Sequence, residues 1–199
     1  MLWIKRIVLT ASLLISLVGM SVSLAESDTA DYELDTEIFE IPDHGELIMD
    51  VPRLWNYNFT KTDDQTPPLI TFYVLDENKS EIFQLNMSVF WEDGYARNIT
   101  TTEYIKTMVT EAGENTLRYS DEDKLELVDL NGREGEGYYF QLTDSSAGDG
   151  EYRLLTQGAL GVGKVLLVFS LFSNDEEGIL RDAMLRALES ARHRARRDV

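Results

Sequence analysis

Residues 158–164 (GALGVGK) have the glycine and lysine spacing of a phosphate-binding loop. Such a loop needs a Ser or Thr directly after the lysine, because that hydroxyl binds Mg²⁺. Here Val165 follows Lys164, and the pattern beyond it predicts a strand instead of a helix whose N-terminus would hold phosphate. We therefore expect a hairpin turn in which glycine adopts a positive φ, and no nucleotide cofactor.

Histidine and cysteine chemistry is nearly absent from the chain. The only histidines are His44, before the first expected strand of the folded domain, and His193, in a basic tail. We expect them not to meet, and therefore not to form a two-histidine metal site. Cysteine is missing, which excludes thiol catalysis and thiolate metal ligands. There is no Gly-x-Ser-x-Gly motif for a serine nucleophile. We expect no catalytic residue, no resident metal and no cofactor.

Acidic turns are the remaining candidates for ion binding. Residues 76–80 begin like a calcium loop, but Glu81 replaces its glycine and Met87 stands where the closing bidentate Glu is required. Residues 121–123 and 144–151 match the pattern less well. We interpret all of them as solvated turns and leave Ca²⁺ binding open as the alternative.

Three large aromatic side chains are the candidate partner-binding residues. Trp55, Trp91 and Tyr95 lie at the ends of expected strands, where the packing of a core is least able to cover them. Exposed aromatic residues contribute strongly to binding. We expect a partner to dock near them, on the exposed side of the sheet or at its edge. In the alternative interpretation all three are structural plugs.

The charge balance limits the class of partner. The chain has 36 acidic and 18 basic residues. A surface with this excess of negative charge repels polyanions, and we therefore expect no nucleic-acid partner. Basic proteins, cationic peptides and divalent cations fit better, unless the acidity serves solubility alone. The basic residues at 192–197 are expected to end the last helix, where cations are favoured.

Residues 1–25 have the pattern of a secretory signal peptide. Lys5 and Arg6 precede an apolar stretch, and Ser23 and Ala25 are the small residues that a signal peptidase accepts. We expect cleavage after Ala25 and a periplasmic or secreted protein; a membrane anchor is the alternative, because residues 7–25 are uncharged. We expect residues 26–44 to form an acidic flexible lead-in and residues 45–197 a single α+β domain.

Alternating hydrophobicity predicts a domain built mainly of strands. Strands are expected over 47–51, 55–59, 69–75, 82–91, 125–130, 137–142, 151–159 and 164–172. The last of these is apolar on both faces, which predicts a central position with Leu167 and Phe169 in the core. Capping boxes at Thr100 and Ser173 predict two helices, the first ending at Gly113. Residues 131–132 (Asn-Gly) predict a hairpin turn.

Residues 47–55 (LIMDVPRLW) resemble the opening of the Mog1/PsbP-like group: an apolar strand, Val-Pro, two residues and a Trp. The strand at 135–140 and the last helix are similar in order, so the resemblance covers residues 45–192. It implies an α+β fold, an antiparallel β-sheet flanked by helices in an α/β/α sandwich. It also implies a mostly non-catalytic accessory or binding function, without shared catalytic residues.

These observations predict an exported, soluble, non-catalytic binding or accessory protein without a cofactor. Its partner is expected to be another protein of the cell envelope or a small ligand. The alternative is a carboxylate- or metal-dependent hydrolase of the cell envelope, because carboxylate pairs occur throughout so acidic a chain.

Overall fold

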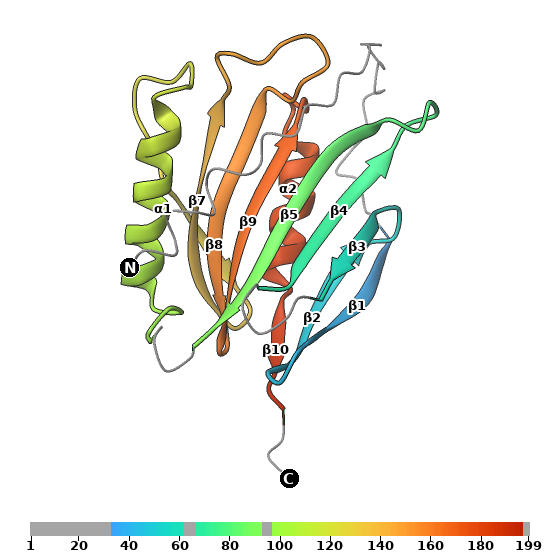
Figure 1. Cartoon of the computed structure of the whole chain (residues 1–199), viewed down its shortest axis with the longest axis vertical. Helices are drawn as coiled ribbons and strands as arrows, with labels where there is room; N and C mark the ends of the chain where they lie inside the picture. Colours follow the sequence, from blue (N-terminus) through green and yellow to red (C-terminus); the bar gives the residue numbers. More distant parts are fainter. Residues whose placement is uncertain (1–32, 62–66, 93–96, 197–199) are drawn as a thin grey trace.

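The computed structural model describes residues 33–61, 67–92 and 97–196, which form two antiparallel sheets and two helices (Figure 1). The elements in chain order are β1 (Leu34–Ile41), β2 (Gly45–Pro52), β3 (Asn56–Thr60), β4 (Leu69–Leu75), β5 (Glu81–Trp91), α1 (Thr102–Leu117), β6 (Val128–Gly132), β7 (Gly135–Thr143), β8 (Leu154–Val162), β9 (Val165–Ser173), α2 (Ile179–Glu189) and β10 (Arg192–Arg194).

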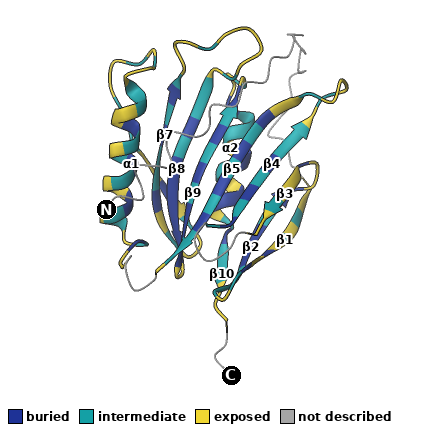
Figure 2. Cartoon of the chain, viewed as in Figure 1, coloured by how far each residue is buried: buried dark blue, intermediate teal, exposed yellow. Residues whose placement is uncertain are grey.

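The larger sheet has seven strands in the order β3-β4-β5-β9-β8-β7-β6, so β9 is its middle strand. Leu167 and Phe169 of β9 are fully buried. This confirms the central position that the apolar pattern of the strand predicted. Figure 2 shows buried residues along β5, β9 and β8.

The two faces of this sheet are covered by different layers. α1 packs on one face over β7 and β8, and its Ile105 belongs to the same buried cluster as Phe140 and Leu166. On the other face, α2 and the small sheet, ordered β1-β2-β10, enclose the larger core. The predicted fold class, α+β with an antiparallel sheet flanked by helices, is confirmed. Neither helix of the described residues is long and apolar enough to cross a membrane.

The prediction that residues 26–44 form a flexible lead-in was wrong for its second half. Residues 34–41 form β1, which pairs with β2 along its whole length. Phe39 and Ile41 lie in the core, and Phe39 makes edge-to-face contact with Tyr57 and Phe72. Arg53 pairs with Glu33 and Asp35. The acidic composition hid this strand, because partners distant in sequence neutralise its carboxylates.

The helix boundaries also differ from the prediction. The N-cap of α1 is Thr101, whose hydroxyl accepts a hydrogen bond from the Tyr104 N–H. The helix continues past Gly113, which is buried inside it, since a Cβ there would lie 2.5 Å from a methyl group of Leu125. Gly113 therefore permits close packing and does not end the helix.

α2 begins later than Ser173 and ends earlier than the basic tail. Its N-cap is Gly178, with φ +77°, and the Asp175 carboxylate accepts from the Leu180 N–H at 2.6 Å. The helix stops at Glu189. The expectation that the basic tail belongs to this helix was wrong, because residues 192–194 pair with β2 as strand β10.

Two hairpins test the turn predictions. The 158–164 segment forms the β8–β9 hairpin, and Gly163 has φ +57° in its turn, as predicted. In the β6–β7 hairpin, Gly132 pairs with Gly135, so residues 133–134 make the turn and residues 131–132 belong to β6. The predicted Asn-Gly turn is displaced by two residues, and the strand predicted at 125–130 runs from 128 to 132.

Candidate functional site

The structure separates the three aromatic residues expected to bind a partner. Trp55 is only 8% exposed and packs in the core, with ring centroids 4.9 Å from Phe83 and 6.0 Å from Phe72. Its surface is therefore covered by the protein itself. Trp91 lies far from Trp55. It is eight residues along β5 from Phe83, the residue that Trp55 contacts, and eight residues span about 26 Å at strand spacing. Tyr95 lies outside the described residues.

Trp91 is half-buried at one end of β5 and stacks on His44, with ring centroids 4.4 Å apart. His44 in turn lies beside His193, whose Nε2 is 2.7 Å from the His44 carbonyl oxygen. The expectation that the two histidines do not meet was wrong, because β10 pairs with β2 and carries His193 back to the β1–β2 turn. Within the described ranges, no group of three or more His, Cys, Asp or Glu side chains could hold a metal ion.

The uncovered part of the sheet face on the α1 side carries polar side chains that bond to one another. The Thr71 hydroxyl and the Gln84 amide donate to Asn86 Oδ1, at 2.9 and 3.1 Å. On the neighbouring strands, the Gln157 amide donates to the Ser170 hydroxyl at 3.2 Å. These groups are half-buried, and their mutual bonds satisfy part of their hydrogen-bonding capacity.

Three connections converge at the end of the sheet where this face stops. They join α1 to β6, β7 to β8 and β9 to α2, and we call residues 118–127, 144–153 and 174–178 the loop end (Figure 1, top). They carry ten acidic and three basic residues. The Ser145 N–H donates to the Tyr119 carbonyl, and the Arg153 N–H donates to Asn174 Oδ1 at 2.8 Å. The loops are therefore tied to one another.

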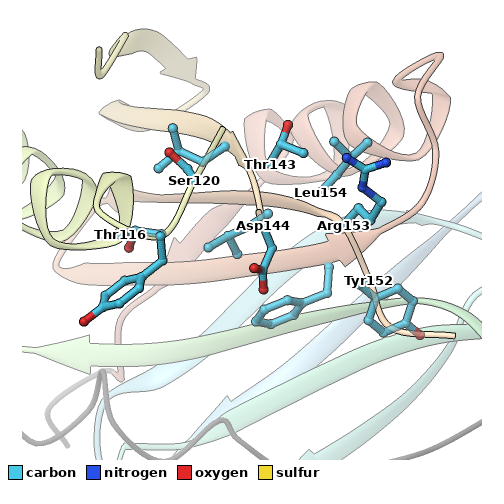
Figure 3. Close-up of a pocket in the computed structure, with 11 residues that line it drawn as sticks. Thr116, Ser120, Thr143, Asp144, Tyr152, Arg153 and Leu154 are labelled. Carbon is cyan, nitrogen blue, oxygen red and sulfur yellow. The ribbon is translucent and has the colours of Figure 1, made fainter. Parts of the chain in front are cut away.

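A small amphipathic hollow of about 100 Å³ opens in the loop end (Figure 3). Asp144 lies at its middle, with Thr116 and Ser120 on one side and Tyr152 and Arg153 on the other. Apolar side chains complete the lining: Leu142, Leu154, Leu155 and Phe172.

Tyr152 is a fixed part of this wall. Its hydroxyl donates to the Glu81 carbonyl oxygen at 3.0 Å, which ties the β7–β8 loop to β5. Burial, and to a smaller degree the charge of Glu81, raise the pKa of Tyr152 to about 12. The hydroxyl is therefore protonated across the physiological range.

A larger and more polar hollow of about 630 Å³ adjoins the first one. Arg153 lines both, and its guanidinium lies 3.5 Å from the Asp121 carboxylate. The other charged residues of this lining are Asp149, Glu151 and Glu176, all acidic and exposed. The two hollows together present an apolar floor next to a negatively charged rim.

In the acidic turns, several carboxylate oxygens accept hydrogen bonds from groups of their own loop. Asp76 Oδ1 accepts from the N–H groups of Asn78 and Ser80, and Asp144 Oδ1 accepts from Ser146. Burial raises the pKa of Glu122, but hydrogen bonds from Thr143 outweigh this effect and the pKa lies below its usual value. Glu122 is therefore charged at neutral pH.

The aromatic residues that the sequence suggested as partner-binding residues do not belong to the loop end. Its three segments are separated by more than fifteen residues each, and only the topology brings them together. The acidic turns at 121–123 and 144–151 were the available signal, but a sequence pattern does not reveal that two such turns share a hollow.

No known protein family matches the chain, and no curated protein matches it. A crystal structure of a protein from Bacteroides thetaiotaomicron VPI-5482 is similar, at 17% identity and a TM-score of 0.44; the match covers 74% of this chain but only 45% of that one. The solution structure of PsbP (CyanoP) from Synechocystis sp. PCC 6803 is similar at 11% identity and a TM-score of 0.47, covering 85% of this chain and 99% of that one. A PsbP is thus among the solved structures to which the chain is similar.

Proposed function

We propose that this chain is an exported, non-catalytic binding or accessory protein of the cell envelope, and that it binds a basic partner protein at the loop end. The observation that carries this proposal is the convergence of three acidic loops around an amphipathic hollow. Negative potential at such a surface attracts a basic partner, and an apolar hollow accepts a side chain that anchors it.

Two carboxyl groups of the loop end have charge states that suit the attraction of a basic partner. Glu122 and Glu126 have pKa values below the usual range, because hydrogen bonds from Thr143 and Lys124 respectively stabilise their charged forms. A carboxylic acid that donates a proton in hydrolysis needs a raised pKa near neutrality. Charged carboxylates instead suit the attraction of a cationic surface.

The test uses a defined cationic probe and the chain from residue 26 onward. A short Lys- and Arg-rich peptide with one central Leu, and the same peptide with Ala in its place, are titrated calorimetrically at low and at physiological salt. We expect the Leu peptide to bind more tightly than the Ala peptide, and both to weaken as salt rises.

The variants locate the surface. The double variant Asp149→Asn/Glu176→Gln should weaken binding by about fivefold or more, since it removes two rim charges. The matched control Glu92→Gln/Asp129→Asn changes the net charge equally, at exposed residues that line neither hollow, and should bind like the wild type. Equal weakening by both variants would show that net charge, and not this surface, attracts the peptide.

A further inference from the structure

The end of the molecule opposite the loop end holds the short C-terminal strand β10. β10 pairs with β2 through only three residue pairs, from Arg192–Ile48 to Arg194–Glu46. Three turns of the chain meet there: the β1–β2 turn with His44, the β6–β7 turn with Glu134, and the β8–β9 turn with Lys164. All three contact the same residue of β10, His193.

His193 uses its backbone and both ring nitrogens. Its backbone N–H donates to Glu134 Oε2 at 2.8 Å, and its Nδ1 accepts from the Lys164 N–H at 3.3 Å. Its Nε2 lies 2.7 Å from the His44 carbonyl oxygen, which can only accept. The two ring bonds are compatible only with a neutral ring that carries its hydrogen on Nε2.

Protonation removes this arrangement. A second hydrogen on Nδ1 turns an acceptor into a donor and places it against the Lys164 N–H, another donor. The ring then loses its place in the turn, and the strand that carries it is paired with β2 through only three residues. We propose that His193 is a pH-sensitive latch, whose neutral ring holds β10 on the small sheet and whose protonation in mildly acidic medium releases the strand.

The charged groups around the latch include both signs. Glu134 accepts from the His193 backbone, and the Lys164 side chain is exposed beside it. Arg192 lies 3.7 Å from Asp50, Arg194 2.9 Å from Glu46 and Arg196 2.7 Å from Asp43. The Arg192 pair is only about one-third exposed and also holds β10 on β2. The other two pairs are more exposed, so each contributes little to the attachment of β10.

His44 responds to pH in the same direction. Its pKa lies below its usual value, because burial of the ring outweighs the opposing charge of Asp43. A basic group whose pKa is lower in the folded than in the unfolded chain binds fewer protons in the folded state. The stability that it contributes is therefore lost as the pH falls. The carbonyl that His44 offers to His193 belongs to the backbone and survives substitution of its ring.

The experiment is an NMR titration of the chain from residue 26 onward, which contains just two histidines. Ring nitrogen shifts report the tautomer of His193, and hydrogen exchange corrected for its intrinsic pH dependence reports the attachment of β10. We expect the Nε2–H tautomer near about pH 7.5, and a loss of protection at Arg192 and Arg194 of about tenfold or more near about pH 5. A charged ring, or an Nδ1–H tautomer, near about pH 7.5 would overturn the proposal.

Two variants separate the histidines. His193→Asn keeps an acceptor near the position of Nδ1 without a titrating ring, so the protection of Arg192 and Arg194 should no longer depend on pH. His44→Phe keeps a ring for stacking on Trp91 and keeps the backbone carbonyl, so the pH dependence should persist. If His44→Phe abolishes the pH dependence, or His193→Asn retains it, His193 is not the latch.

Discussion

Phe169 and Phe172 lie on opposite faces of β9, and their burial differs. Phe169 is fully buried under α2 and the small sheet, whereas Phe172 is half-buried at the end of the other face. Truncating a buried Phe to Ala costs about 3–5 kcal/mol. We expect Phe169→Ala to lose most of the protein's stability against urea, and therefore to unfold at a much lower urea concentration. Phe172→Ala should lower the midpoint of the urea transition much less. Equal shifts for the two variants would contradict the central role of Phe169.

Tyr152 offers a pH-dependent test at a single residue. Tyr152→Phe removes the hydroxyl that donates to the Glu81 carbonyl, and we expect a loss of about 1 kcal/mol in the free energy of unfolding at neutral pH. The folded pKa of Tyr152 is raised to about 12, so its contribution is present below the unfolded value and is lost as pH rises toward about 12.

Urea unfolding of wild type and variant at neutral and at alkaline pH measures this difference in stability. The gap between the two proteins should narrow only as the pH rises from about 10 toward about 12. A gap that is constant through this range would show that the Tyr152 hydroxyl does not ionise differently in the folded state.

At the scale of elements, β1 joins the small sheet to the large one. Phe39 is 1% exposed and touches Tyr57, Phe59 and Phe72, whereas Ile38, one residue earlier, is 54% exposed on the outer face. We expect Phe39→Ala to cost about 3–5 kcal/mol in a urea titration. Ile38→Ala should cost far less, because its side chain buries little surface. Similar losses for both would mean that β1 is not docked as described.

At the scale of the whole molecule, charge is distributed unevenly between the two ends. The loop end concentrates acidic residues. The opposite end holds Lys164 together with Arg192, Arg194 and Arg196, which pair with Asp50, Glu46 and Asp43 respectively. The basic partner that we propose would therefore be attracted more strongly to the loop end than to the opposite end.

The proposed export can be tested by the N-terminus of the exported chain. Lys5, Arg6 and the Ser23 to Ala25 motif predict that the chain recovered outside the cytoplasm begins at Glu26. Mass spectrometry of that chain, isolated from the culture medium or the periplasm, measures its N-terminus. Recovery of a chain with Met1 in the membrane fraction would support the membrane-anchor alternative instead.

Local pattern was sufficient for most of the sheet. The alternation of side chains in β2, β4, β5 and β7, and the doubly apolar β9, follow from a two-residue period that the backbone imposes on any half-buried strand. The α+β class and the central position of β9 were predictable for that reason. The turn at Gly163 was predictable as well, because a positive φ favours glycine.

Tertiary structure decided the features that depend on distant partners. β1 is a strand because Arg53, Lys61 and β2 accommodate its acidic residues, and the basic tail leaves α2 because β2 offers a free edge. The same pairing brings His193 to His44, and the sheet topology gathers the three acidic loops around one hollow. Sequence by itself determined which segments are extended and which are helical, since that depends on neighbours a few residues apart. Which segments meet depends on packing between them, and so only the folded chain determined the candidate site.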